Sequence, residues 1–204
     1  MKLYYAPGAC SLAPHIVAKE AGIAVDLEKV DLAAHKLADG SDYYDVNPRG
    51  YVPAIRVKAD EPVLTEANVV VQFLADQKPE AGLMPKAGTP ERYRAQQWLA
   101  FVATELHKNF SWLWHKDTPA ETKAAVKDKL NKRFAELDAH LKGNDYLLGK
   151  SFSAADAYAF TIINWVNFLG MNLKSFPNLQ AFMDRVAARP KVQEALKAEG
   201  LVAA

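Results

Sequence analysis

The sequence predicts two domains, an α/β domain with a small mixed sheet and an all-α helical domain after it. Strand-like and helix-like stretches alternate up to residue 78, whereas only helical periodicity is found from residue 89 onward. The segment between them is rich in proline and glycine, which is typical of a linker. We therefore expect a first domain over residues 1–78, a linker over 79–88 and a helical domain over 89–204.

The first elements are a strand, a turn and a helix. Residues 3–5 (Leu-Tyr-Tyr) are typical of a strand, and residues 7–8 (Pro-Gly) predict a turn. Apolar residues recur in helical register from Ser11 onward, and Pro14 falls in the first turn, where its missing N–H costs little. Cys10, the only cysteine of the chain, is therefore predicted at the start of a helix.

Further strands complete the predicted sheet. Residues 25–32 alternate imperfectly between polar and apolar side chains, residues 54–58 alternate more cleanly, and residues 63–64 follow an acidic turn. Together with the first elements they give the order strand, helix, strand, short helix, strand, strand, helix. This order describes a small mixed sheet covered by helices.

The second half contains amphipathic helices. Four apolar side chains at intervals of four, three and four define one helix face: Leu130, Phe134, Leu137 and Leu141. An earlier long helix is predicted to begin at residues 89–91 (Thr-Pro-Glu). Ser153 and Asp156 form a capping-box pattern, in which both side chains satisfy backbone donors at a helix start. The helix that follows is apolar nearly all round, so we expect it at the centre of the bundle.

Composition and charge exclude several classes of function. The chain has 25 Lys and Arg against 24 Asp and Glu, a net charge of +1, so charge gives no case for a nucleic-acid or membrane-surface partner. No apolar stretch reaches the roughly 20 residues that span a bilayer, and the amino terminus lacks the pattern of a secretory signal. One cysteine excludes an internal disulfide and a multi-cysteine zinc site. We expect a cytoplasmic protein without a metal site.

Cys10 is the first candidate for chemistry. A cysteine beside the unpaired N–H groups and the positive end of a helix dipole can have its pKa lowered from about 8.5 to roughly 3.5–7.5, which makes thiolate available at neutral pH. The alternative is that Cys10 is a small buried hydrophobic residue, as free cysteines commonly are. The local sequence leaves both interpretations open.

Three other segments could hold a ligand. A cis bond between Val52 and Pro53, at the end of the loop over residues 47–53, would leave the Val52 N–H and C=O free to pair with a peptide-like ligand; the alternative is an ordinary turn. Glu66 opens a helix, where it could bind an ammonium while the helix N-terminus binds a carboxylate, or could merely complement the helix dipole. His107 could donate to a ligand or accept a proton from a thiol, or could be structural.

Three of these residues define the shape of a ligand. Cys10, Val52 and Glu66 each follow or precede a strand, and they would gather at one end of the predicted sheet. A ligand that met all three would need a thiol-reactive end, an amide backbone in the middle and an amino-acid terminus. Glutathione has this form.

The order and spacing of the segments also resemble a known family. The chain is similar along essentially its whole length to the glutathione transferases, most closely the bacterial beta class. The resemblance is carried by residues 1–5 (MKLYY), 7–11 (PGACS), 47–48 (NP), 52–53 (VP), 64–66 (LTE), 105–108 (ELHK), 146–149 (YLLG) and 153–156 (SAAD). It implies a thioredoxin-like amino-terminal domain, a helical carboxyl-terminal domain and a homodimer.

The resemblance implies roles for individual residues. Cys10 would lie near the glutathione sulfur and be able to form a mixed disulfide with it, and His107 would approach that sulfur from the helical domain. Val52, which precedes Pro53, would pair with the cysteinyl backbone of glutathione. Further contacts to glutathione, some of them across the dimer, are implied for Tyr5, Ser11, Tyr51, Glu66, Ala67, Thr104 and Glu105.

Two positions depart from the family pattern. Related sequences commonly offer a lysine to the glycine carboxylate of glutathione, whereas this chain has His35 followed by Lys36. Either residue could make that contact. Ala100 stands where an asparagine is common, and it offers no side-chain hydrogen bond.

The predicted function is conjugation of the glutathione thiolate to small electrophilic apolar compounds, a transfer of alkyl or aryl groups. Glutathione would be a co-substrate, with no other cofactor, and aromatic side chains of the helical domain would form the wall of the second-substrate site. One alternative is monothiol disulfide exchange, or reductive dehalogenation, through Cys10. Another is a non-catalytic ligand-binding or interaction protein of the same fold.

Overall fold

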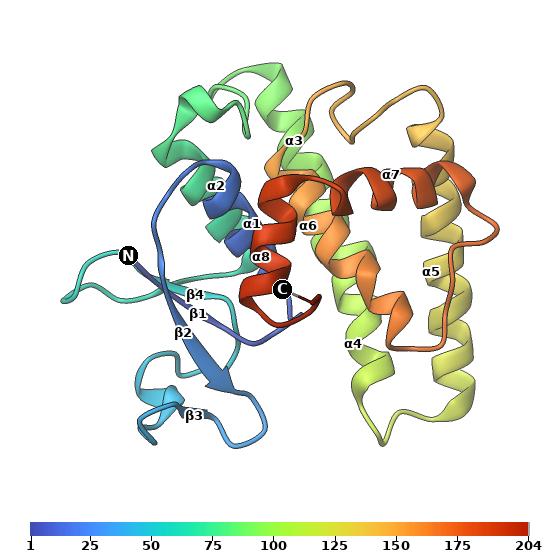
Figure 1. The fold of residues 1–204 in the computed structure, drawn as a ribbon. Helices are drawn as coiled ribbons and strands as arrows, with labels where there is room; N and C mark the ends of the chain where they lie inside the picture. Colours follow the sequence, from blue (N-terminus) through green and yellow to red (C-terminus); the bar gives the residue numbers. More distant parts are fainter. Residues whose placement is uncertain (204) are drawn as a thin grey trace. The chain divides into compact units, whose positions relative to one another are not determined.

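The computed structural model describes residues 1–203, and its first unit is built on a five-stranded mixed sheet (Figure 1). The strands are β1 (Lys2–Tyr5), β2 (Asp26–Asp31), β3 (Lys36–Leu37), β4 (Ala54–Arg56) and β5 (Leu64–Thr65), in the spatial order β3-β2-β1-β4-β5. Strands β1 and β2 are parallel, and the other neighbours are antiparallel. The predicted mixed sheet is confirmed. Strand β3 was not predicted, because two residues give no period to detect.

The helices of this unit come from both ends of the described chain. They are α1 (Leu12–Glu20), the short η1 (Tyr43–Asp45), α2 (Ala67–Gln77), the short η2 (Pro79–Ala81) and α8 (Pro190–Ala198). Helix α1 provides the crossover that parallel strands require, and it packs against both α2 and α8 (Figure 1). The unit comprises Met1–Met84 and the chain from Arg189 onward, which the sequence analysis had assigned to the helical domain. The domain boundaries expected from the sequence stay a prediction.

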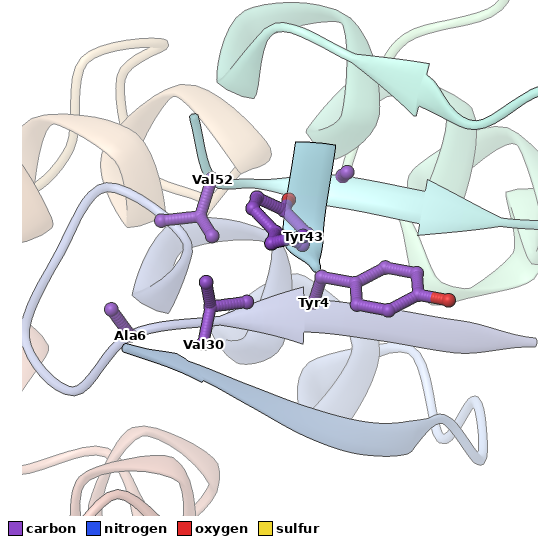
Figure 2. Close-up of a cluster of buried hydrophobic side chains, with 6 residues drawn as sticks. Tyr4, Ala6, Val30, Tyr43 and Val52 are labelled. Carbon is purple, nitrogen blue, oxygen red and sulfur yellow. The ribbon is translucent and has the colours of Figure 1, made fainter. Parts of the chain in front are cut away.

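Side chains of the sheet alternate between its two faces. Leu3 and Ile55, which are paired in register, are fully buried on one face, and Tyr4 and Ala54 lie on the other. The second face carries a buried group that we call the sheet cluster: Tyr4, Ala6, Val30, Tyr43, Val52 and Ala54 (Figure 2). Because this cluster includes Val52, it holds the loop before β4 against the sheet.

The second unit, Pro85–Ala188, consists of helices and their connections. These are α3 (Pro90–Phe101), the π-helical turn η3 (Val102–His107), α4 (Lys108–Trp114), α5 (Ala120–Leu141), α6 (Ala154–Ile163), the short η4 (Asn164–Asn167) and α7 (Pro177–Ala187). Helix α5 buries the four apolar residues predicted for its inner face, and α6 is buried along its whole length, as expected. No helix within residues 1–203 combines the length and the apolar character needed to cross a membrane.

The start of α6 refines the predicted capping box. The Asp156 carboxylate accepts from the Ser153 N–H at 2.8 Å, from the Ser153 hydroxyl at 2.6 Å and from the Leu147 N–H at 2.7 Å. Both halves of the predicted capping box are present, since the Ser153 side chain also accepts from the backbone N–H of Asp156. Burial raises the pKa of Asp156 to about 6, against the opposing effect of those hydrogen bonds.

Candidate functional site

Cys10 lies in the turn between β1 and α1, two residues before the helix begins. Its side chain is buried, and its thiol donates to the carbonyl oxygen of Val52 at 3.1 Å. The turn is fixed from within by Ser11, whose hydroxyl accepts from the Ala6 N–H at 3.1 Å and donates to the Ala6 carbonyl at 3.2 Å. Ser11 therefore holds the turn, and its polar group is already engaged with the backbone.

The electrostatics of Cys10 distinguish between the two interpretations that the sequence left open. Burial raises the pKa of the Cys10 thiol from 9.0 to about 12, because a thiolate would lose its hydration there. The N–H groups of Cys10 and Ser11 act in the opposite direction, and the Glu66 carboxylate raises the pKa further. Of the two interpretations that the local sequence left open, the structure supports a buried, protonated thiol, because burial outweighs the effect of the helix start on the pKa. In this structure Cys10 is a neutral hydrogen-bond donor.

The loop before β4 presents a backbone donor to the same region. The bond between Val52 and Pro53 is cis, the form that the loop sequence left open. The preceding carbonyl, that of Tyr51, accepts from the Tyr43 hydroxyl at 2.8 Å and from the Asn47 side-chain amide at 2.7 Å. The Val52 side chain packs in the sheet cluster (Figure 2), and its N–H has no acceptor within residues 1–203. Of the two Val52 backbone groups expected to be free, only the N–H is.

Glu66 joins β5 to α2 with a positive φ of 67°, which is uncommon for a residue with a Cβ. Its carbonyl accepts from the N–H groups of the third and fourth residues of α2, both at 2.9 Å. The N–H groups of Ala67 and Asn68 have no acceptor within residues 1–203. The Glu66 carboxylate is exposed and lies 3.0 Å from Nη1 of Arg49. An anionic acceptor and unpaired backbone donors thus occur side by side, as an amino-acid group requires.

His35 is held in an irregular position between β2 and β3. Its φ is 51°, its ring stacks on that of Tyr44 at 4.5 Å, and its Nδ1 is buried without a partner within residues 1–203. A Cβ atom at Gly50 would lie 2.8 Å from that Nδ1, so this close approach requires the glycine. The ammonium of the neighbouring Lys36 is 3.3 Å from the Asp42 carboxylate.

Tyr5 and Tyr51 differ in exposure: Tyr5 is partly buried, and Tyr51 is exposed. The Tyr5 ring lies 6.5 Å from that of His15, and burial, together with the Glu199 carboxylate, raises the pKa of its hydroxyl. Tyr51 is 67% exposed, so its ring is available to a ligand while its carbonyl is engaged within the loop.

His107 belongs to the π-helical turn η3 of the helical unit. Its Nδ1 lies 2.7 Å from the hydroxyl of Tyr158, and the rings of Tyr158 and Trp165 meet it edge to face. Burial, with a smaller contribution from the Lys108 ammonium, lowers the pKa of His107 to about 4. The imidazole is therefore neutral at pH 7.

Thr104 and Glu105 precede His107 in the same turn, and both have partners within their own unit. The Thr104 hydroxyl donates to the carbonyl of Ala100 at 3.0 Å. The Glu105 carboxylate accepts from Nε of Arg133 at 2.7 Å and lies 3.8 Å from Nζ of Lys129. Their predicted contacts to glutathione stay predictions.

Sequence reasoning missed Glu199, which supports the turn that carries Cys10. The Glu199 carboxylate is buried, accepts from the Gly8 N–H at 3.0 Å and lies 2.9 Å from Nδ1 of His15. A Cβ atom at Gly8 would be 3.3 Å from Leu201, so this segment also packs closely on the turn. The contact spans 191 positions of sequence, and no local pattern marks it. Asn47 was missed as a donor although its Asn-Pro motif was noted.

Comparisons with known proteins agree with this geometry. Residues 8–77 match the model of the glutathione S-transferase N-terminal domain, and residues 97–190 match that of the C-terminal domain. The chain is 44% identical over 201 residues to glutathione S-transferase GstA of Escherichia coli O157:H7, covering 98% of this chain and 100% of the relative. The chain belongs to the glutathione S-transferase family.

Solved structures point to the same family and class. A sphingomonad glutathione S-transferase complexed with glutathione is 42% identical, with a TM-score of 0.94 over 99% of this chain and 100% of the other. A bacterial beta class glutathione S-transferase of Sphingomonas chungbukensis is 44% identical, with a TM-score of 0.94 and the same coverage. The resemblance inferred from the sequence is confirmed, as is the fold that it implies.

Proposed function

We propose that this protein binds glutathione and conjugates its thiolate to small electrophilic apolar compounds. The observation that carries the proposal is the set of unpaired backbone donors at Val52, Ala67 and Asn68, near Cys10 and Glu66, in a member of this family. The Val52 N–H would pair with the cysteinyl carbonyl of glutathione. The donors that begin α2 would take the α-carboxylate of its glutamyl group, and the Glu66 carboxylate would take the ammonium.

In the proposed reaction the glutathione thiol loses its proton and the sulfur attacks an electrophilic carbon. A C–S bond forms as the bond to the leaving group breaks; with an aryl chloride, chloride departs. We propose that Cys10 acts as a donor to the glutathione thiolate rather than as the nucleophile. The support is its pKa of about 12, which keeps the thiol protonated at neutral pH. His107 would be a second donor to the sulfur.

Further residues complete the proposed site. His35 is our candidate for the glycine carboxylate, because the Lys36 ammonium is paired with Asp42. Three exposed aromatic residues of the helical unit offer an apolar surface for the electrophile: Trp112, Trp114 and Phe168. Contacts from Tyr5, Ser11, Tyr51, Pro53, Thr104 and Glu105 stay predictions. So do the homodimer and the cytoplasmic location.

The test is glutathione-dependent turnover of an activated aryl chloride by the purified protein. We expect turnover that requires glutathione, and retention of the protein on immobilised glutathione. The Cys10→Ala variant should still conjugate, at a reduced rate, and should lose all formation of a mixed disulfide with oxidised glutathione, measured by intact mass before and after reductant. Tyr93→Phe, a change of an exposed tyrosine on α3, is the control that should behave like the wild type.

Two outcomes would replace the proposal with an alternative. If the wild type reduces mixed disulfides of glutathione but conjugates no electrophile, and Cys10→Ala does neither, the protein is a monothiol exchange enzyme. If neither activity is found across a panel of electrophiles while glutathione is still retained, the protein is a non-catalytic ligand carrier.

A further inference from the structure

The helix that carries His107 contains one widened turn. Residues of α3 and α4 are joined without a break by η3, in which hydrogen bonds span five residues rather than four. Such a turn inserts one extra residue into the helix and therefore rotates the side chains on either side relative to a continuous α-helix. Widened turns of this kind occur frequently at functional sites.

A buried side chain fills the gap that the widened turn creates. The Asn109 amide nitrogen donates to the carbonyl of Glu105 at 2.7 Å and to that of Thr104 at 3.3 Å. Asn109 is buried, so these bonds replace water at two carbonyls of η3. The Asn109 side chain thus stabilises the turn η3. This turn directs His107 toward α6.

On α6, the partner of His107 is a single hydroxyl. The Tyr158 oxygen lies 2.7 Å from Nδ1 of His107, and Tyr158 is 2% exposed. The ring of Trp165 meets the imidazole edge to face at 5.1 Å, which limits its rotation. Since the imidazole is neutral, one ring nitrogen carries a hydrogen and the other accepts. A phenol is a far stronger acid than a neutral imidazole N–H, so the favoured arrangement is O–H donating to Nδ1.

We propose that Tyr158 is a positioning residue that donates its hydroxyl hydrogen to Nδ1 of His107 and so fixes the tautomer with hydrogen on Nε2. The Nε2–H then serves as a donor to the glutathione thiolate, so the inference rests on the proposed function. Tyr158 acts through His107 and itself contacts neither glutathione nor electrophile. No bond is made or broken in this step.

The tautomer can be read directly in the wild-type protein. We expect nitrogen-15 NMR of labelled histidine to show His107 with a protonated Nε2 and an unprotonated Nδ1 at pH 7. In Tyr158→Phe, the Nδ1 resonance should shift and a mixture of tautomers should appear. A protonated Nδ1 in the wild type would overturn the proposal, whatever the variant does and whether or not the protein is active.

Steady-state kinetics of single and double variants at Tyr158 and His107 test whether Tyr158 acts on the reaction through His107. Tyr158→Phe is expected to lower kcat about fivefold, the typical effect of one hydrogen bond, with little change in the KM for glutathione. In a His107→Ala background the same substitution should have no further effect, because it acts through the missing imidazole. Tyr93→Phe again serves as the control for loss of a tyrosine hydroxyl in the same unit.

The possible failures are distinguishable. An equal loss of kcat from Tyr158→Phe with and without His107 would mean a structural role and would overturn the proposal. A His107→Ala variant with unchanged kcat would overturn it too, while glutathione conjugation by the wild type would leave the proposed function standing. If the wild type conjugates nothing, the proposed function fails first, and the NMR measurement still decides the tautomer.

Discussion

The two ends of the candidate glutathione site differ in burial and in the way their polar groups are satisfied. At one end the Cys10 thiol is buried and bonded to the carbonyl of Val52. At the other, the side chains of Glu66 and Arg49 are 61% and 68% exposed and, within residues 1–203, pair only with each other. This difference indicates that desolvation controls the chemistry at the Cys10 end, whereas accessible charge controls binding at the Glu66 end. Substitutions should therefore alter reactivity at one end and affinity at the other.

The largest effect is expected in the reactivity of Cys10. At pH 7 a thiol with a pKa of about 12 carries about a thousandfold less thiolate than one with a pKa of 9.0. Alkylation of the folded protein by iodoacetamide should be slower than that of the urea-unfolded chain by about this factor. The folded-state rate should rise steadily with pH and reach no plateau below about pH 9. Rapid alkylation at pH 7 with a plateau would support the lowered pKa that a helix start can produce and would contradict the contrast between the two ends.

Glu66→Gln should give the next largest effect, on affinity. The substitution keeps the shape of the side chain but removes the charge that would meet the glutathione ammonium. A charged hydrogen bond contributes about 1.5–3 kcal/mol, so the KM for glutathione should rise at least about tenfold, with kcat changed far less. Steady-state kinetics check this against Glu80→Gln, which removes an exposed acid from η2. An unchanged KM would show that accessible charge does not control this end.

Asn47→Ala should have an intermediate effect at the buried end. It removes one of two donors to the Tyr51 carbonyl and the acceptor of the Arg49 N–H. We expect the free energy of unfolding to fall by about 1–2 kcal/mol in urea titrations. The matched variant Tyr43→Phe, which removes the other donor but keeps the ring, should cost about 1 kcal/mol. A change in unfolding free energy near zero for both variants would mean that packing of the sheet cluster alone holds the loop.

The smallest effect is expected from Arg49→Met. This substitution removes the ion pair between Arg49 and Glu66, in which both side chains are exposed to solvent. Because exposed pairs contribute little, the free energy of unfolding should change by no more than about 0.5 kcal/mol. Urea unfolding of Arg49→Met beside Asn47→Ala measures the contrast between exposed and buried ends in one experiment. A larger loss from Arg49→Met would contradict it.

Local patterns predicted much of the fold. The turn before α1 and the inner face of α5 followed from periodicity and from Pro and Gly, which act over a few residues. The π-helical turn η3 did not, because its signal is Asn109 bonding to carbonyls four and five residues earlier, in a stretch that otherwise reads as helix. The packing of α8 against α1 was not predicted either, because the periodicity of a helix does not indicate which element it packs against.

The sequence predicted a set of candidate site residues but not their electrostatics. Cys10, Val52 and Glu66 were found from the elements that they begin or end. The direction of the Cys10 pKa shift stayed open, because the helix start is visible in the sequence and the degree of burial is not. The contacts of Ser11 and Glu105 to a ligand stay predictions; the structure shows Ser11 bonded to Ala6 and Glu105 bonded to Arg133.

The hydrogen bond from the Gly8 N–H to the Glu199 carboxylate has a consequence for synthesis of the protein. The amino-terminal unit is formed by two segments, and the whole helical unit is translated between them. A ribosome must therefore complete that insertion before the turn beside Cys10 can receive its acceptor, 191 positions downstream. A nascent chain that stalls within the helical unit would carry a thiol without its finished turn. The turn that carries Cys10 can therefore be completed only after the second unit has been translated.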